Sequence, residues 1–224
     1  MVRGNGKVAR EEHREYVVTP GQKGVDKHLV KFDGRYESKG QFHPYDKPGY
    51  TYKEMDIDGE LIDDMSNDFT DAKTSKDGIA RDLFPLTREK QTEYSFRLLG
   101  TEAYRGRTVY RIGFQPKEKE SNAAWKGEAL IDAVEYQPVS IQSKLAFGIP
   151  AAVKVLLGTN IKGLGFSVTY QKFDEGLWFP VSYGGEFDIR AVFFYKRTIS
   201  INLANSDFRR TDVTSNVAYI VENP

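Results

Sequence analysis

Most of the chain after residue 93 alternates between apolar and polar positions. Tyr94, Phe96 and Leu98 alternate with Ser95 and Arg97, and a period of two is typical of a β-strand that buries one face. The same pattern predicts further strands over residues 108–114, 127–131, 139–147, 166–170, 179–183 and 187–203. Because only short turns separate most of these segments, we expect neighbouring strands to run antiparallel.

The first 55 residues also read as strands, with turn residues between the apolar runs. We expect one strand over His13–Thr19, ended by Pro20-Gly21, and a second over Lys27–Phe32. The pair Asp33-Gly34 is a turn signal and is expected to close the second strand. Residues 36–50 contain two glycines and two prolines and are predicted to form a loop.

Two segments in the middle of the chain carry a helical pattern. The apolar stripe of the first consists of Leu61, Ile62, Met65 and Phe69. This spacing predicts a helix of about three turns. Residues 79–84 predict a second, short helix that stops at Pro85. With so few helices, and with strands that each have one apolar and one polar face, we predict a mainly β (α+β) fold. In this fold a curved antiparallel sheet wraps around one to three short helices.

Composition narrows the possible functions. The chain has 224 residues, 32 Lys and Arg, 32 Asp and Glu, three His and no Cys. The absence of cysteine excludes disulfide frameworks, zinc ribbons and thiol nucleophiles. A formal net charge of zero argues against nucleic acid or an anionic membrane as the main partner, since both require an excess of Lys and Arg. We expect one domain over residues 1–224.

The chain contains no segment that predicts membrane insertion or export. No window approaches 18 apolar residues, so no transmembrane helix is expected. The first seven residues lack the apolar region of a secretory signal peptide. Two compartments are therefore open, the cytoplasm and, for the processed part of an exported protein, the cell envelope.

No motif points to catalysis or to a metal. The spacing of 15 between His13, His28 and His43 matches no compact set of metal ligands, although facing strands could bring the first two together. Residues 54–60 resemble part of a calcium loop but lack its first Asp and last Glu, so a turn leading into the helix is the better interpretation. Nucleophile-elbow, phosphate-loop and dinucleotide motifs are missing. We expect no catalytic residue, no metal and no cofactor.

Four short segments resemble a known family of proteins. They are Gly100–Tyr110 leading to Phe114–Pro116, then Trp125–Asp132, Tyr136–Val139 and Gly176–Pro180. Together they resemble the LolA/LolB-like superfamily, which comprises periplasmic lipoprotein carriers and outer-membrane lipoprotein-sorting proteins. The resemblance covers about 40% of the chain, and its motifs are strand-and-turn signatures. In this comparison residues 41–77 look like a loop or helix insertion.

The resemblance implies a half-open antiparallel β-barrel that covers helices and holds acyl chains in an apolar cavity. It also implies a periplasmic or otherwise exported, non-enzymatic protein, which we expect to be a monomer. The implied partner is a lipid or a lipoprotein acyl chain. The family's carriers use an arginine to gate the cavity, and no motif assigns that role to a position in this sequence.

The candidate ligand-binding residues lie on the apolar face of the predicted sheet. They are Phe96, Leu98, Tyr110, Ile112, Phe114, Ile131, Ile141, Leu145, Val168 and Tyr170. For any one of them, ordinary core packing is the simpler interpretation. The segment 148–158 is the most apolar of the chain and does not alternate. It is either a plug at the open end of the sheet or a mobile flap over a cavity. The candidate flap residues are Ile149, Val153, Leu156 and Leu157.

Two other classes of function remain open at this point. The same fold with a filled core could serve as a structural or interaction module that offers its sheet to a cell-envelope protein. A hydrolase with scattered acidic residues is the third class, since a chain with 32 acidic residues could contain an unrecognised carboxylate pair.

Overall fold

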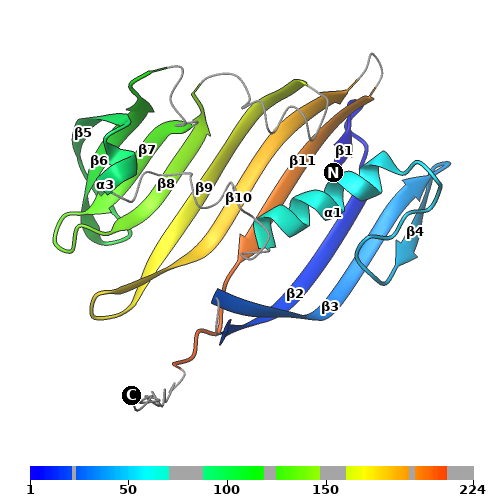
Figure 1. The fold of residues 1–224 in the computed structure, drawn as a ribbon, viewed down its shortest axis with the longest axis horizontal. Coiled ribbons are helices and arrows are strands. Elements are labelled where there is room, and N and C mark those ends of the chain that lie inside the picture. The colour runs from blue at the N-terminus through cyan, green and yellow to red at the C-terminus, as the bar shows by residue number, and fades with distance from the viewer. Residues whose placement is uncertain (22–23, 71–87, 119–124, 147–159, 192–194, 211–224) are drawn as a thin grey trace, which may run out of the picture.

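In the segments that it describes, the computed structural model has two antiparallel sheets and two helices (Figure 1). The structure describes residues 1–21, 24–70, 88–118, 125–146, 160–191 and 195–210. The large sheet has eight strands in the order β1-β11-β10-β9-β8-β7-β6-β5 and does not close on itself. This architecture confirms the predicted curved antiparallel sheet with short helices.

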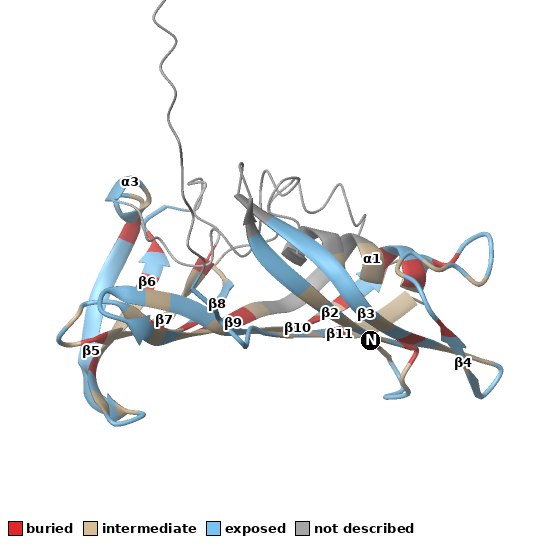
Figure 2. Ribbon diagram, turned by 90° about the horizontal axis from the view of Figure 1, so that it is seen from below, coloured by how far each residue is buried: buried red, intermediate tan, exposed pale blue. Residues whose placement is uncertain are grey.

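The strands of the large sheet follow one another along the chain, apart from β1. Their bounds are β1 Val2–Arg3, β5 Tyr94–Tyr104, β6 Arg107–Pro116, β7 Trp125–Asp132, β8 Pro138–Leu145, β9 Asn160–Asp174, β10 Leu177–Ala191 and β11 Tyr195–Ala204. Seen from the side, β5 turns out of the plane of the middle strands (Figure 2). The predicted strand over 187–203 is wrong as a single element, because β10 ends at Ala191 and β11 pairs back against it. No Gly or Pro lies in that run to signal the reversal.

The small sheet comprises β2 (Arg10–Gly21), β3 (Gly24–Ser38) and β4 (Gln41–Tyr45), in that order. The predicted turn at Asp33-Gly34 and the predicted loop over 36–50 are wrong here. Strand β3 continues through Gly34, which pairs with Glu12 on one side and Tyr45 on the other, and a Cβ at that position would overlap the Tyr45 ring. The glycine thus makes room for an aromatic side chain, and the reversal instead comes at Lys39-Gly40, where both residues have positive φ angles (52° and 82°).

Helix α1 (Ile57–Thr70) confirms the first predicted helix. It lies on the same side of the large sheet as the β2–β3 hairpin and close to the β1–β11 edge (Figures 1 and 2). The second predicted helix, over 79–84, lies outside the described residues. A short helix that was not predicted, α3 (Arg88–Gln91), precedes β5. No helix in the described ranges is both long and apolar enough to span a membrane.

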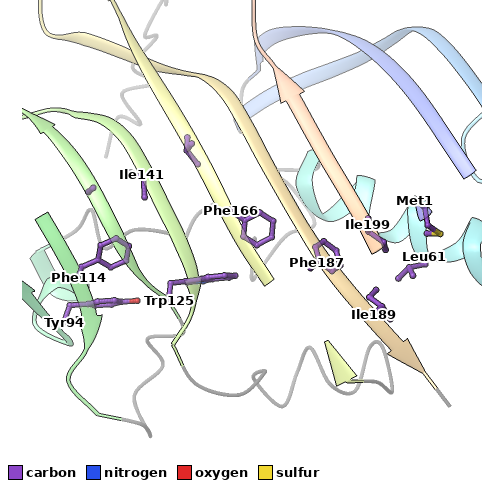
Figure 3. Packing of buried hydrophobic residues seen from close by; sticks show 12 residues of the cluster. Met1, Leu61, Tyr94, Phe114, Trp125, Ile141, Phe166, Phe187, Ile189 and Ile199 are labelled. Carbon is purple, nitrogen blue, oxygen red and sulfur yellow. The ribbon is translucent and has the colours of Figure 1, made fainter. Parts of the chain in front are cut away.

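The hydrophobic core lies on one face of the large sheet, and Leu61 of α1 joins it beside Ile189 and Ile199 (Figure 3). Its buried members are Met1, Leu61, Tyr94, Phe114, Trp125, Ala129, Ile141, Phe166, Val168, Phe187, Ile189 and Ile199. The strand residues among them come from alternate positions of β5 to β11, as a sheet with one covered face requires. The core therefore fixes which face of each strand is available for another role.

Candidate functional site

Strand register separates the two faces of the large sheet into an apolar row and a polar row. The apolar row crosses the sheet through Leu98, Ile112, Ala129, Ile141, Val168, Tyr183 and Leu203. One residue away on most strands, the polar row consists of Arg97, Gly113, Glu128, Gln142, Ser167, Gly184 and Asn202. A ligand on the first face would meet hydrocarbon, and one on the second face would meet charges and amides.

The ten residues predicted to line an apolar cavity lie on the core-bearing face. Phe114, Ile141 and Val168 are buried members of the core. The partly buried residues Ile131, Leu145 and Tyr170 pack against it. The protein itself already covers these six side chains, so their apolar surface contributes to folding.

The remaining four predicted lining residues, all on β5 and β6, form an apolar strip beyond the buried core. Phe96 is 42% exposed and Leu98 is 62% exposed, and their register partners are Phe114 and Ile112. Ile112 and Tyr110 are half-buried. We call Phe96, Leu98, Tyr110 and Ile112 the β5–β6 apolar strip. The four candidate flap residues, 149, 153, 156 and 157, lie outside the described residues.

The strip continues the aromatic packing of the core. The Tyr94 ring contacts the rings of Phe96 and Phe114, with centroid distances of 6.3 and 6.0 Å. Phe96 is therefore held from one side while part of its ring faces solvent. Burial raises the pKa of the Tyr94 hydroxyl and keeps it neutral. The strip offers no charged side chain, so it can hold a ligand by apolar burial and by ring contacts.

The opposite face carries an open trough of about 1120 Å³ across the sheet. We call it the polar trough. Its polar side chains include Arg97, Arg111, Lys126, Glu128, Gln142, Lys144, Ser167, Glu186, Ser200 and Asn202. The alternation of the strands identified these positions as solvated, but it could not show that they form one concave surface. That property depends on strand order, register and the bend at β5.

A second group of polar residues is buried beneath the small sheet. The Arg10 guanidinium is fully buried and donates from Nη1 to Asp56 Oδ2 (2.8 Å) and from Nε to the Tyr45 hydroxyl (2.7 Å). The Tyr45 hydroxyl donates to Glu12 Oε1 at 2.7 Å. Burial is the main cause that raises the pKa of Tyr45. Every group has a partner, and we assign this Arg10 network to structure.

Asp56 also explains the acidic segment 54–60. Its Oδ1 accepts the backbone N–H of Gly59 at 3.2 Å, so Asp56 caps the start of α1. Two residues further on, Asp58 binds Arg197 with both carboxylate oxygens (2.8 and 3.0 Å) and accepts a hydrogen bond from the Tyr195 hydroxyl at 2.7 Å. Both carboxylates lie near the helix N-terminus, where negative charge is favourable. The interpretation of this segment as a turn into the helix is confirmed.

The three histidines lie apart. His13 faces Asp33 across the strands and contacts Glu15 (3.1 Å), while His28 faces Val17. The His43 ring stacks on Tyr36 with a centroid distance of 5.2 Å. Within the described segments, no group of three or more His, Asp or Glu side chains is arranged to hold a metal ion.

The conspicuous turn residues Asp132 and Trp178 meet at one end of the sheet. Asp132 accepts the backbone N–H groups of Val134 and Glu135 and an N–H of Arg107 (2.9, 2.8 and 3.1 Å). Glu135 in turn accepts hydrogen bonds from Lys172 Nζ (2.6 Å) and Trp178 Nε1 (3.0 Å). These bonds fix the β7–β8 turn against β9 and β10, so the motif residues have structural tasks.

Comparisons with known proteins complete the description. No protein-family model matches this chain, and no curated protein matches it. Among solved structures, it is similar to an outer membrane lipoprotein-sorting protein domain from Vibrio parahaemolyticus. That match has 14% sequence identity and a TM-score of 0.35, and it covers 89% of this chain and 84% of the other. We therefore argue function from this chain's own side chains.

Proposed function

We propose that this protein is a non-enzymatic carrier that binds an apolar ligand on the core-bearing face of the large sheet. The ligand class is a lipid acyl chain, free or attached to a lipoprotein. One observation carries the proposal: Leu98 and Phe96, at 62% and 42% exposure, pair with Ile112 and Phe114 and so extend the apolar face of the sheet as far as the bulge that follows Leu98. The sequence resemblance supports a periplasmic or otherwise exported location.

The binding free energy would come from removing hydrocarbon from water. Each Å² of apolar surface removed from water contributes about 25 cal/mol. A chain that covers about 200 Å² of combined protein and ligand surface would thus gain about 5 kcal/mol before the costs of association. The buried part of the row needs no ligand, since Ile141 is only 1% exposed. The proposed contact is therefore confined to the β5–β6 apolar strip.

Adjacent leucines on β5 allow a matched test. Leu98 lies on the apolar row, whereas Leu99, 42% exposed, lines the polar trough beside Gly113. We expect Leu98→Gln to weaken binding of a fluorescent fatty acid about fivefold to tenfold, and Leu99→Gln to leave it unchanged. Fluorescence titration gives the dissociation constant of the fatty acid for each variant. Native mass spectrometry of the purified protein detects a lipid that co-purifies.

Two results would contradict the proposal. One is the absence of both a co-purified lipid and fatty-acid uptake by the wild-type protein. The other is an equal loss of binding in the two leucine variants, which would locate the probe elsewhere. The location is tested separately by fractionating cells that express the native gene, and recovery from the cytoplasm alone would contradict export.

A structural or interaction module of the cell envelope is the second candidate. Phe114, Ile141 and Val168 are only 3%, 1% and 6% exposed, so the middle of the apolar face is filled by the protein itself. A module of this kind would take up no fatty acid and would be recovered with an envelope protein after crosslinking. The fatty-acid titration thus separates the two candidates.

A further inference from the structure

The polar trough crosses seven strands of the large sheet, on the face opposite the core. Its central row runs from Arg97 on β5 to Asn202 on β11. With neighbouring strands about 4.8 Å apart, six intervals give a length of roughly 29 Å. A surface of this length and a volume of about 1120 Å³ suits an extended chain better than a single small ion.

Positive charge is concentrated in this trough. Four cations line it, Arg97, Arg111, Lys126 and Lys144, against two carboxylates, Glu128 and Glu186. The whole chain has a formal net charge of zero, so the excess is local. Arg111 donates from Nε to Glu128 Oε2 at 2.7 Å, and this hydrogen bond raises the pKa of Arg111.

Three cations in the trough, Arg97, Lys126 and Lys144, have no ion-pair partner within the described part of the chain. Lys126 and Lys144 face each other directly across β7 and β8. Like charges in this position destabilise a sheet, and the next residue across from Lys144 is Gly165, which has no side chain. An anion held between the two lysines would remove this repulsion.

The neighbouring groups indicate which kind of anion fits. Gln142, Ser167 and Asn202 each offer a donor and an acceptor, as peptide groups do, whereas phosphate and sulfate esters mainly accept. A Cβ on Gly184 would come within 3.2 Å of Asn202 Oδ1 and 3.9 Å of Ser167 Oγ, so the glycine keeps the floor open between these side chains.

The trough offers little aromatic stacking. Of its three phenylalanines, Phe114 and Phe166 have their rings in the core on the other face (Figure 3), and Phe96 lies at the β5 end of the trough. Neutral sugars and exposed bases gain much of their affinity from such stacking. Carboxylates on an extended peptide match both the free cations and the amide row.

We propose that the polar trough binds an extended, acidic segment of a partner protein. Carboxylates of the segment would pair with Lys126, Lys144 and Arg97, and its backbone would bond to the amide and hydroxyl groups of the central row. The cationic centre of the site, Lys126 and Lys144, lies on the opposite face of the sheet from Leu98, Tyr110 and Ile112 of the β5–β6 apolar strip, and only Phe96 of that strip also lines the trough. The failure of either proposal leaves the other intact.

Fluorescence anisotropy with a labelled 12-residue peptide of alternating Glu and Ser tests the proposal. We expect the wild-type protein to bind this peptide at low ionic strength and to release it as salt is added. The double variant Lys126→Gln, Lys144→Gln should bind about tenfold more weakly. The double variant Lys126→Arg, Lys144→Arg keeps the charge and should bind within about twofold of wild type.

A control of equal charge separates the site from general attraction. Lys7 and Lys47 are exposed and lie outside the trough, so Lys7→Gln with Lys47→Gln should leave binding unchanged. Thermal melting followed by circular dichroism confirms that each variant is folded. Equal weakening by both Gln pairs, no binding of the peptide by wild type, or tighter binding of inorganic polyphosphate than of the peptide would overturn the proposal.

Discussion

The two sheets bury very different side chains to the same degree. In the large sheet the most deeply covered residues are apolar, with Ile141 and Ile199 each 1% exposed. At the small sheet, Arg10 is 0% exposed and its partner Asp56 is 1% exposed. A sheet of eight strands can enclose hydrocarbon over a wide area, whereas three strands against the start of a helix enclose a charged pair and tyrosine rings.

This difference teaches where each region is vulnerable. An apolar core distributes its stabilisation over many weak contacts. A buried ion pair depends on both members, because removal of one leaves a charge without a partner in a site of low dielectric. The stacked rings around Arg10, such as Tyr36 on Tyr52 (centroids 4.5 Å) and Tyr45 on Tyr50 (5.0 Å), add packing but cannot neutralise that charge.

The largest effect should come from Arg10→Met. It leaves the Asp56 carboxylate buried without its cation, and we expect a loss of about 3–5 kcal/mol in the free energy of unfolding. Urea denaturation measures it. Arg35→Met is the matched control, since the Arg35 pair with Glu11 is about half exposed, and its loss should stay below about 1 kcal/mol. Similar losses in the two variants would contradict the prediction that the buried Arg10–Asp56 pair matters more for stability than an exposed pair.

A cavity in the core of the large sheet should lower the free energy of unfolding somewhat less than the loss of Arg10 does. Ile141→Ala removes three methyl or methylene carbons from the core, and we expect a loss of about 3 kcal/mol. The neighbouring residue Gln142 points into the polar trough, so Gln142→Ala should change the free energy of unfolding by about 0.5 kcal/mol or less. If Ile141→Ala were equally mild, the apolar core would not dominate this sheet.

Weakening the contact between α1 and the large sheet should have an intermediate effect on the free energy of unfolding. Asp58→Asn weakens the paired bonds to Arg197, and we expect a loss of about 1–2 kcal/mol. The pKa of Tyr195 is raised, chiefly by burial and then by Asp58, so it should fall in the variant when followed by ultraviolet titration. A double-mutant cycle with Arg197→Met that shows no coupling would contradict a direct pair.

The smallest effect should be at the end of the large sheet, and it should depend on pH. Burial opposes ionisation of Asp132, but the N–H groups of Glu135 and Val134 and the Arg107 guanidinium together hold its pKa below the usual value. A lowered pKa stabilises the folded state above about pH 4, and this contribution is lost as the pH falls further. We expect Asp132→Asn to cost about 1 kcal/mol at pH 7.

Measurement of the same variant at low pH provides the check. The gap between wild type and Asp132→Asn in the free energy of unfolding should begin to narrow below about pH 4, where the carboxyl of the unfolded chain becomes protonated, and should close as the pH falls through the lowered pKa of the folded state. Asp174→Asn, at the exposed β9–β10 turn, should show no such gap. A gap for Asp132 that stays constant with pH would exclude the charge as its cause.

The sequence predicts the large sheet well because each strand there has a single buried face. The alternation of Tyr94, Phe96 and Leu98 places all three on the core-bearing face that the register of β5 and β6 shows. In the small sheet it finds only the central parts of β2 and β3, residues 13–19 and 27–32, because the covered face there carries Arg10 and Glu12 and therefore looks solvated. Gly34 reads as a turn residue in the sequence, whereas in the structure it is a strand residue whose lack of a side chain makes room for the Tyr45 ring.

The candidate sites could be predicted only in part for a related reason. Alternation identifies the apolar face, but exposure depends on what covers it, so Leu98 and Ile141 look alike in the sequence and differ in the structure by 62% against 1%. The polar trough depends on side chains from seven strands. Lys126 and Lys144 are 18 positions apart, and only register places them opposite each other.

The strand order also sets a sequence of events during synthesis on the ribosome. Strands β5 to β11 pair with their neighbours along the chain, so each hairpin can form as soon as its second strand emerges. Strand β1 is the exception, because Val2 pairs with Thr198. Strand β1 precedes all of these strands in the sequence but can pair only after β11 has formed, and until it does so the β11 edge remains open to pairing with other chains.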